Sequence, residues 1–98
     1  MKYVLFNKSQ RELLTNANTM LERILNESKN ELIRVTKEEG EIYAKANKFE
    51  AEHGVDDALT QSAWRRWTLA MEDKQALANR LNELEDAMRF NSRLLKNV

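Results

Sequence analysis

The sequence predicts an all-α fold: one long antiparallel helical hairpin that pairs into a four-helix bundle or a coiled-coil-like dimer. The chain has no proline and only two glycines, Gly40 and Gly54, whereas β-rich or loop-rich folds need more of both for their turns. Charged residues make up 33% and hydrophobic residues 42% of the chain, which suits elongated helices with one apolar side. Apolar residues also recur at alternating spacings of four and three, the coiled-coil period.

A chain of 98 residues is expected to form a single domain. We divide it into an N-terminal segment at 1–8, a helix at 9–53, a turn at 54–56 and a helix at 57–96. Helices of about 45 and 40 residues would each extend about 60–68 Å at 1.5 Å per residue. These matched lengths favour a hairpin that uses nearly the whole chain.

The first helix is predicted from a start signal and from an unbroken apolar pattern. Ser9-Gln10-Arg11-Glu12 has the form of a capping box, in which the Ser hydroxyl accepts from a free helix N–H and the Glu reaches back. The apolar pattern, which we call the seam, combines two sets of positions seven residues apart. One set is Leu14, Leu21, Ser28, Val35, Ile42 and Phe49, and the other is Asn18, Leu25, Leu32, Glu39, Ala46 and His53.

The two glycines have different predicted roles. Gly54 is the best stop signal in the chain, because glycine commonly ends helices, and Asp56 or Asp57 can cap the next helix. Gly40 lies inside the first pattern, whose phase continues across it. A glycine there costs about 1 kcal/mol relative to alanine, so we expect a weak point or gentle kink and not a loop.

The second helix follows the same alternation and ends with cations, which suit a helix C-terminus. Its seam is interrupted by Lys74. The cations of its last turns are Arg89, Arg93 and Lys96. The seam positions are Ala63, Trp67, Ala70, Lys74, Leu77, Leu81, Leu84, Met88, Asn91 and Leu95.

The chain carries more apolar surface than one seam needs, which is typical of a helix in a bundle. The excess is greatest at the open end of the hairpin, and a second group surrounds the two tryptophans. We therefore predict a protein interface, the simplest partner being a second copy of the chain. Its residues are Leu13, Ala17, Met20, Ile24, Trp64, Trp67, Met71, Met88, Phe90 and Leu94.

Trp64-Arg65-Arg66-Trp67 is the most distinctive tetrapeptide. Core packing of the tryptophans is the simplest interpretation. Tryptophan and arginine are also favoured in protein interfaces, and aromatic rings beside arginine can stack bases and hold phosphates. A nucleic-acid accessory protein that uses Trp64, Arg65 and Arg66 is therefore the alternative function.

Two further segments have a structural and a functional interpretation. Glu50 and His53 have the Glu-x-x-His spacing of di-metal bundle sites, but one copy of the chain supplies only one such motif, so we favour a structural or capping histidine. A metal-dependent bundle enzyme across a dimer is the third hypothesis. The segment Tyr3-Val4-Leu5-Phe6 could add as an edge strand to a partner, or fold back as an apolar cap, which we favour.

Composition argues against several classes of function. Sixteen basic residues balance sixteen acidic ones, which removes the simplest electrostatic case for binding nucleic acid or an anionic membrane. No cysteine and one histidine leave few of the usual catalytic arrangements, so we expect no enzyme, no cofactor and no metal. No apolar run approaches the roughly 20 residues that span a bilayer. We expect a cytoplasmic protein, although signal-independent secretion would leave no mark.

In size and hairpin plan the chain resembles the small secreted WXG-type helical hairpins. That family carries its Trp-x-Gly in the turn, whereas the turn here is His53-Gly54-Val55-Asp56 and both tryptophans lie on the second helix. No site residue is therefore carried over. The prediction is a protein–protein interaction module, acting as an adaptor, chaperone, inhibitor or assembly factor, that binds a protein partner and itself.

Overall fold

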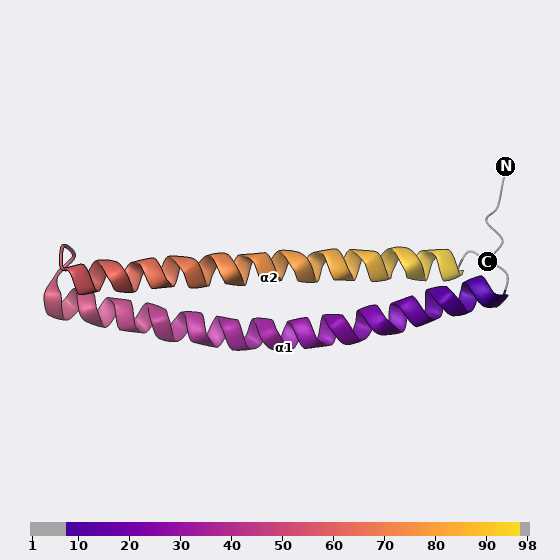
Figure 1. The fold of residues 1–98 in the computed structure, drawn as a ribbon, viewed down its shortest axis with the longest axis horizontal. Coiled ribbons are helices and arrows are strands. Elements are labelled where there is room, and N and C mark those ends of the chain that lie inside the picture. Colours follow the sequence, from indigo (N-terminus) through magenta and orange to yellow (C-terminus); the bar gives the residue numbers. More distant parts are fainter. Residues whose placement is uncertain (1–7, 97–98) are drawn as a thin grey trace. The chain divides into compact units, whose positions relative to one another are not determined.

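The computed structural model describes residues 8–96, which form two long helices. Helix α1 spans Lys8–His53 and helix α2 spans Ala58–Lys96. A turn at 54–57 joins them into a helical hairpin (Figure 1). The predicted all-α hairpin is thus confirmed, and no strand occurs within the described range. Neither helix has an apolar stretch that could cross a membrane.

The hairpin consists of two compact units. Unit 1 contains residues 8–29 of α1 and residues 80–96 of α2. Unit 2 contains residues 30–79, and therefore the turn and the adjoining parts of both helices. In each unit a segment of α1 packs against a segment of α2.

The turn in unit 2 is built by Gly54 and by Asp57, one of the two aspartates predicted as alternative caps. Gly54 has a φ of 87°, a left-handed conformation that glycine adopts without a steric penalty. Its N–H donates to the Glu50 carbonyl at 2.9 Å, which closes the end of α1. Asp57 caps α2: its Oδ1 accepts from the Leu59 N–H at 2.8 Å, and its carbonyl accepts from the Gln61 N–H at 3.0 Å. Asp57 therefore lies before α2 and not in it.

Two predictions about the ends of α1 are wrong. Ser9 is not the N-cap, because α1 already begins at Lys8 and Ser9 lies inside the helix. His53 is not a seam residue. It is the last residue of α1 and its side chain is 40% exposed, since the chain turns away at Gly54. The Tyr3–Phe6 strand or cap lies outside the described residues.

The rest of the predicted seam is confirmed. Every other predicted seam position in both helices is buried or half-buried. In unit 1 the most buried seam side chains are Leu25 and Leu81, which are 8% and 6% exposed. In unit 2 the fully buried positions are small ones, Ala46 and Thr60, with Ala63 8% exposed. The core of each unit is therefore a single thin line of side chains.

Gly40 lies within α1 in unit 2, so the predicted loop-free passage through this glycine is confirmed. A Cβ placed on Gly40 would meet nothing within 4 Å. No close approach of another group therefore requires a glycine there.

Candidate interaction surfaces

An aromatic cluster forms on one flank of the helix pair in unit 2. Tyr43 of α1 lies 5.6 Å from Trp64 and 5.7 Å from Trp67 between ring centroids. The two tryptophans are 5.6 Å apart with an interplanar angle of 87°. Edge-to-face pairs at this distance contribute about 0.5–1.5 kcal/mol beyond their buried area. The predicted packing of Trp64 beside Trp67 is confirmed, and the sequence reasoning missed Tyr43.

Both indole N–H groups in this cluster donate to carboxylates of α1. Trp67 Nε1 donates to Glu39 Oε1 at 2.9 Å, and Trp64 Nε1 donates to Glu50 Oε1 at 3.3 Å. Lys74 Nζ lies 4.0 Å from the other oxygen of Glu39, whose side chain is only 15% exposed. Glu39 and Lys74 are therefore not mere interruptions of the seam. Together with Trp67 they form a polar contact between the helices, which satisfies groups that would be costly to leave unpaired.

The aromatic rings of the cluster contact one another, and both indole N–H groups have acceptors in the same chain. Trp64 and Trp67 are half-buried. Met71 is four residues beyond Trp67 on the same flank and is 38% exposed. Of the predicted interface residues in unit 2, this flank thus brings together Trp64, Trp67 and Met71.

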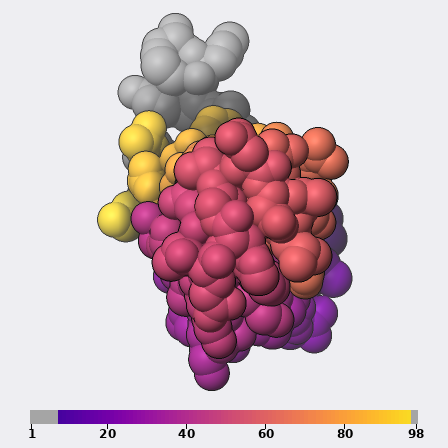
Figure 2. Space-filling model, turned by 90° about the vertical axis from the view of Figure 1, so that its left-hand side faces the viewer, coloured from indigo at the N-terminus to yellow at the C-terminus, as the bar shows by residue number. Residues whose placement is uncertain are grey.

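The other flank of unit 2 carries a groove of about 530 Å³. Its apolar lining is Ile42, Phe49, Leu59 and Ala63, and its polar lining is Glu38, Glu41, Lys45, Ser62 and Arg66. Leu59 is 56% exposed. Figure 2 views the molecule from the turn end, where residues of the turn form the surface nearest the viewer.

The residues of the nucleic-acid hypothesis do not share one surface. Trp64 faces the aromatic flank and donates to Glu50, whereas Arg66 lines the groove on the other flank. Arg65 is exposed between them. A base stacked on Trp64 would therefore not place its phosphate at Arg66.

The residues of the metal hypothesis are engaged in other contacts. Glu50 accepts from Trp64, as described above. His53 lies with its ring 6.1 Å from the Phe49 ring and its Nε2 3.9 Å from Glu52 Oε2. Within residues 8–96 no group of three or more histidines and carboxylates is arranged to hold a metal ion.

Unit 1 has a polar flank and an apolar face. On the polar flank Asn18 Nδ2 donates to Ser92 Oγ at 3.2 Å. The apolar face lies on the far side of the seam. Its residues directly precede, or follow by three, the seam positions Leu14 and Leu21 of α1 and Asn91 of α2. Its members are Leu13, Ala17, Met20 and Ile24 of α1, and Phe90 and Leu94 of α2.

The apolar face of unit 1 is open to solvent. Leu13 is 68% exposed, Met20 is 56% exposed and Phe90 is 61% exposed. Ile24 and Leu94 are half-buried, and Ala17 is exposed. Met88, the remaining predicted interface residue, is half-buried in the seam. The structure thus brings together six of the predicted interface residues on one face.

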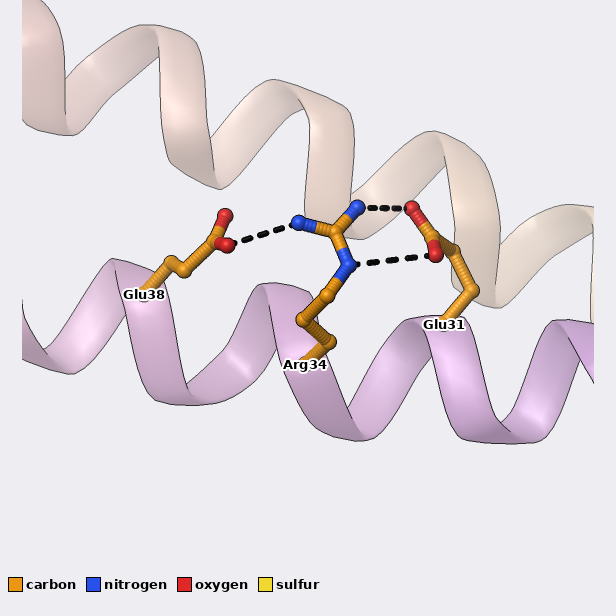
Figure 3. A network of polar contacts seen from close by, with 3 residues as sticks. All are labelled: Glu31, Arg34 and Glu38. Atoms are coloured by element: carbon orange, nitrogen blue, oxygen red, sulfur yellow. Dashed lines mark hydrogen bonds and ion pairs between the residues drawn. The ribbon is translucent and has the colours of Figure 1, made fainter.

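The continuation of that α1 stripe into unit 2 is charged. At the spacings of four and three that follow Ile24, it carries Glu31, Arg34, Glu38, Glu41 and Lys45. Figure 3 shows Arg34 between two carboxylates: its Nη1 lies 2.6 Å from Glu38 Oε1, and its Nε and Nη2 donate to Glu31. The hydrogen bond from Arg34 lowers the pKa of Glu31, and both carboxylates, Glu31 foremost, raise the pKa of Arg34.

Comparisons of the chain with protein-family models, with curated proteins and with solved structures find no match.

Proposed function

We propose that this protein is a protein–protein interaction module, acting as an adaptor, chaperone, inhibitor or assembly factor, and that it also self-associates. The observation that carries the proposal is the apolar face of unit 1. Three of its large side chains, Leu13, Met20 and Phe90, are more than half exposed. Contiguous apolar surface contributed by two helices is typical of a site that binds another protein.

The energetics support burial of this face by a partner. Full burial of a Leu, Met or Phe side chain contributes about 1.5–3 kcal/mol. A partner that covers Leu13, Met20 and Phe90 would therefore recover several kcal/mol that the helix pair leaves unused. The thin core of unit 1, with only Leu25 and Leu81 buried, makes such a gain large relative to the stability of a small domain.

The flanks of unit 2 favour protein over nucleic acid as the partner. Trp64 and Arg66 face different flanks, and the two indole N–H groups already donate to carboxylates. Protein recognition needs no shared stacking surface of this kind. The proposal includes a cytoplasmic setting, with which a chain without cysteine is compatible.

Site-specific photo-crosslinking in the native host tests the proposal. A photoreactive amino acid is placed at Met20 or Phe90 on the apolar face, and at Glu22 or Ser92 on the polar flank of the same unit. These matched positions lie two residues away in the same helices, so expression and helix content serve as internal controls. We expect protein adducts from positions 20 and 90 and few from positions 22 and 92.

A second variant makes the test specific. Met20→Asp places a charge on the apolar face and should abolish adducts formed from position 90. Equal adducts from both flanks, or adducts from position 90 that persist in Met20→Asp, would contradict the proposed binding face.

A further inference from the structure

We propose that a second copy of this chain docks antiparallel on the charged stripe of α1 in unit 2. This inference rests on the self-association proposed above and names the surface that carries it. The part of the stripe used here begins after Glu31, which pairs with Arg34 of its own chain. It consists of Arg34, Glu38, Glu41, Lys45, Lys48 and Glu52, all of which are exposed. Their spacings of four and three place them along one side of the helix.

The signs along the stripe are self-complementary. From Arg34 to Glu52 they run plus, minus, minus, plus, plus, minus. Reading the stripe in the opposite direction gives the same series with every sign exchanged. The centre of this pattern is midway between Glu41 and Lys45.

A two-fold dimer uses such a pattern directly. In a two-fold symmetric interface, if residue i of one copy contacts residue j of the other, then residue j of the first copy also contacts residue i of the second. With the axis at the centre of the stripe, Glu41 meets Lys45 of the other copy, and Lys45 meets its Glu41. Glu38 then meets Lys48, and Arg34 meets Glu52. All three kinds of pair join opposite charges.

The charges nearest the axis are available for this contact. Arg34 is held by Glu31 and Glu38 of its own chain, but in residues 8–96 neither Glu41 nor Lys45 makes an ion pair within 4.0 Å. Arg66, on the α2 side of the groove, likewise has no such pair in that range. The groove therefore presents charges of both signs that lack an ion-pair partner among the described residues.

The groove beside the stripe supplies an apolar contribution. Ile42, Phe49, Leu59 and Ala63 line it between the two helices, and Leu59 is 56% exposed. A second copy seated on the stripe would cover Leu59, so the groove would add an apolar contact beside the line of paired charges at the axis. Protein interfaces combine apolar and polar contacts in this way. A partner of one charge would meet repulsion from half of the stripe, which favours another copy of the same chain.

Sedimentation velocity of the full-length chain across a concentration series tests this arrangement through charge exchange. The variants are Glu41→Lys, Lys45→Glu, the double variant with both changes, and an equimolar mixture of the two single variants. Each single change puts like charges together twice at the axis. We expect each single variant to dimerise more weakly than the natural chain, by on the order of tenfold or more.

The double variant and the mixture should both regain dimerisation, because each again joins opposite charges at the axis. Arg65→Glu is the matched control. It makes the same charge change as Lys45→Glu, at an exposed position of α2 in unit 2 outside the stripe, and should leave the dimer unchanged. Circular dichroism of each variant verifies that helix content is retained.

The possible failures are distinguishable. A natural chain that stays monomeric at several hundred micromolar overturns the self-association and this inference together, while the crosslinking test of unit 1 still stands. A dimer that is insensitive to both single changes, but is lost in Met20→Asp, overturns the docking surface alone. Weakening by the single changes without recovery in the double variant also overturns it.

Discussion

Unit 2 and unit 1 are built from the same two helices but differ in the side-chain contacts that join α1 to α2. In unit 2 the contacts across the seam include three aromatic rings, two indole hydrogen bonds and the approach of Lys74 to Glu39. In unit 1 a polar contact between the helices joins Asn18 Nδ2 to Ser92 Oγ. Unit 1 exposes Leu13, Met20 and Phe90, whereas unit 2 exposes large apolar side chains such as Ile33 and Leu69 beside this network of contacts.

The α1 stripe makes the same contrast within a single helix. Its residues are apolar from Leu13 to Ile24 and charged from Glu31 to Lys45. A helix that only needed one partner helix would be polar along this whole stripe. This change of character supports the proposal above, in which unit 2 stabilises the hairpin and the apolar face of unit 1 binds another protein.

The largest expected effect separates Trp67 in unit 2 from Phe90 in unit 1. Trp67→Ala removes two aromatic contacts and the donor to Glu39, and should lower the free energy of unfolding by about 2–3 kcal/mol, less than for a fully buried tryptophan. Phe90→Ala removes a side chain that is 61% exposed and should change it by less than about 0.5 kcal/mol. Urea unfolding followed by circular dichroism measures both. Equal losses would mean that Phe90 is part of the fold and not of a free face.

Each unit also contains one buried polar atom that has no partner among the described residues, Asn18 Oδ1 in unit 1 and Thr60 Oγ1 in unit 2. Thr60→Val keeps the shape of the side chain and removes the orphan hydroxyl, so it should stabilise the chain by about 1 kcal/mol. Asn18→Leu should stabilise it by a similar amount, because a polar residue in a helical seam reduces stability while fixing the register. A loss of stability in Thr60→Val would show that its hydroxyl has a partner.

The two glycines in unit 2 should respond to alanine with opposite signs. Gly40→Ala adds a Cβ that meets nothing within 4 Å and should stabilise the chain by about 1 kcal/mol. Gly54→Ala forces a φ of 87° on a residue with a Cβ and should destabilise it by about 1–2 kcal/mol. Thermal unfolding of the pair measures the difference directly. A destabilising Gly40→Ala would show that this position has a packing role.

The smallest effect concerns the solvent-exposed Arg34 network. Because the folded-state pKa of Glu31 is lowered, its contribution to stability is present above the ordinary carboxyl pKa and is lost as the pH falls through the lowered value. Arg34→Gln should return the pKa of Glu31 to its ordinary range in an NMR titration, with little change in stability at neutral pH. A Glu31 pKa that does not move would assign the shift to another cause.

Much of this fold could be predicted from the sequence because it depends on periodicity. The seam, the stop at Gly54 and the cap at Asp57 follow from spacing and from backbone preferences that act locally. The start of α1 could not be predicted, because Ser9 satisfies the sequence pattern of a cap while the helix begins before it. A capping motif indicates a competent cap without requiring that the helix begin there.

The contacts between helices were predictable only in part. In the sequence Glu39 and Lys74 look like polar interruptions of the apolar seam. Only the packing of α1 against α2 shows that Glu39 contacts both Lys74 and Trp67. Tyr43 was missed for the same reason. Its one available signal was its place one turn after Glu39, one turn before Ala46 and two turns before Glu50. Cross-helix pairs depend on register, which is set by the turn and not by the spacing along either helix.

Hydrogen exchange of the isolated chain, kept at a concentration low enough to be monomeric, tests the contrast between the units most directly. Local opening reports how many stabilising contacts hold each segment. We expect amides at 39–50 and 60–74 in unit 2 to exchange on the order of tenfold more slowly than amides at 13–25 and 81–94 in unit 1. Equal protection of the amides along both helices, or stronger protection in unit 1, would contradict the proposal that unit 2 stabilises the hairpin while the apolar face of unit 1 binds a partner.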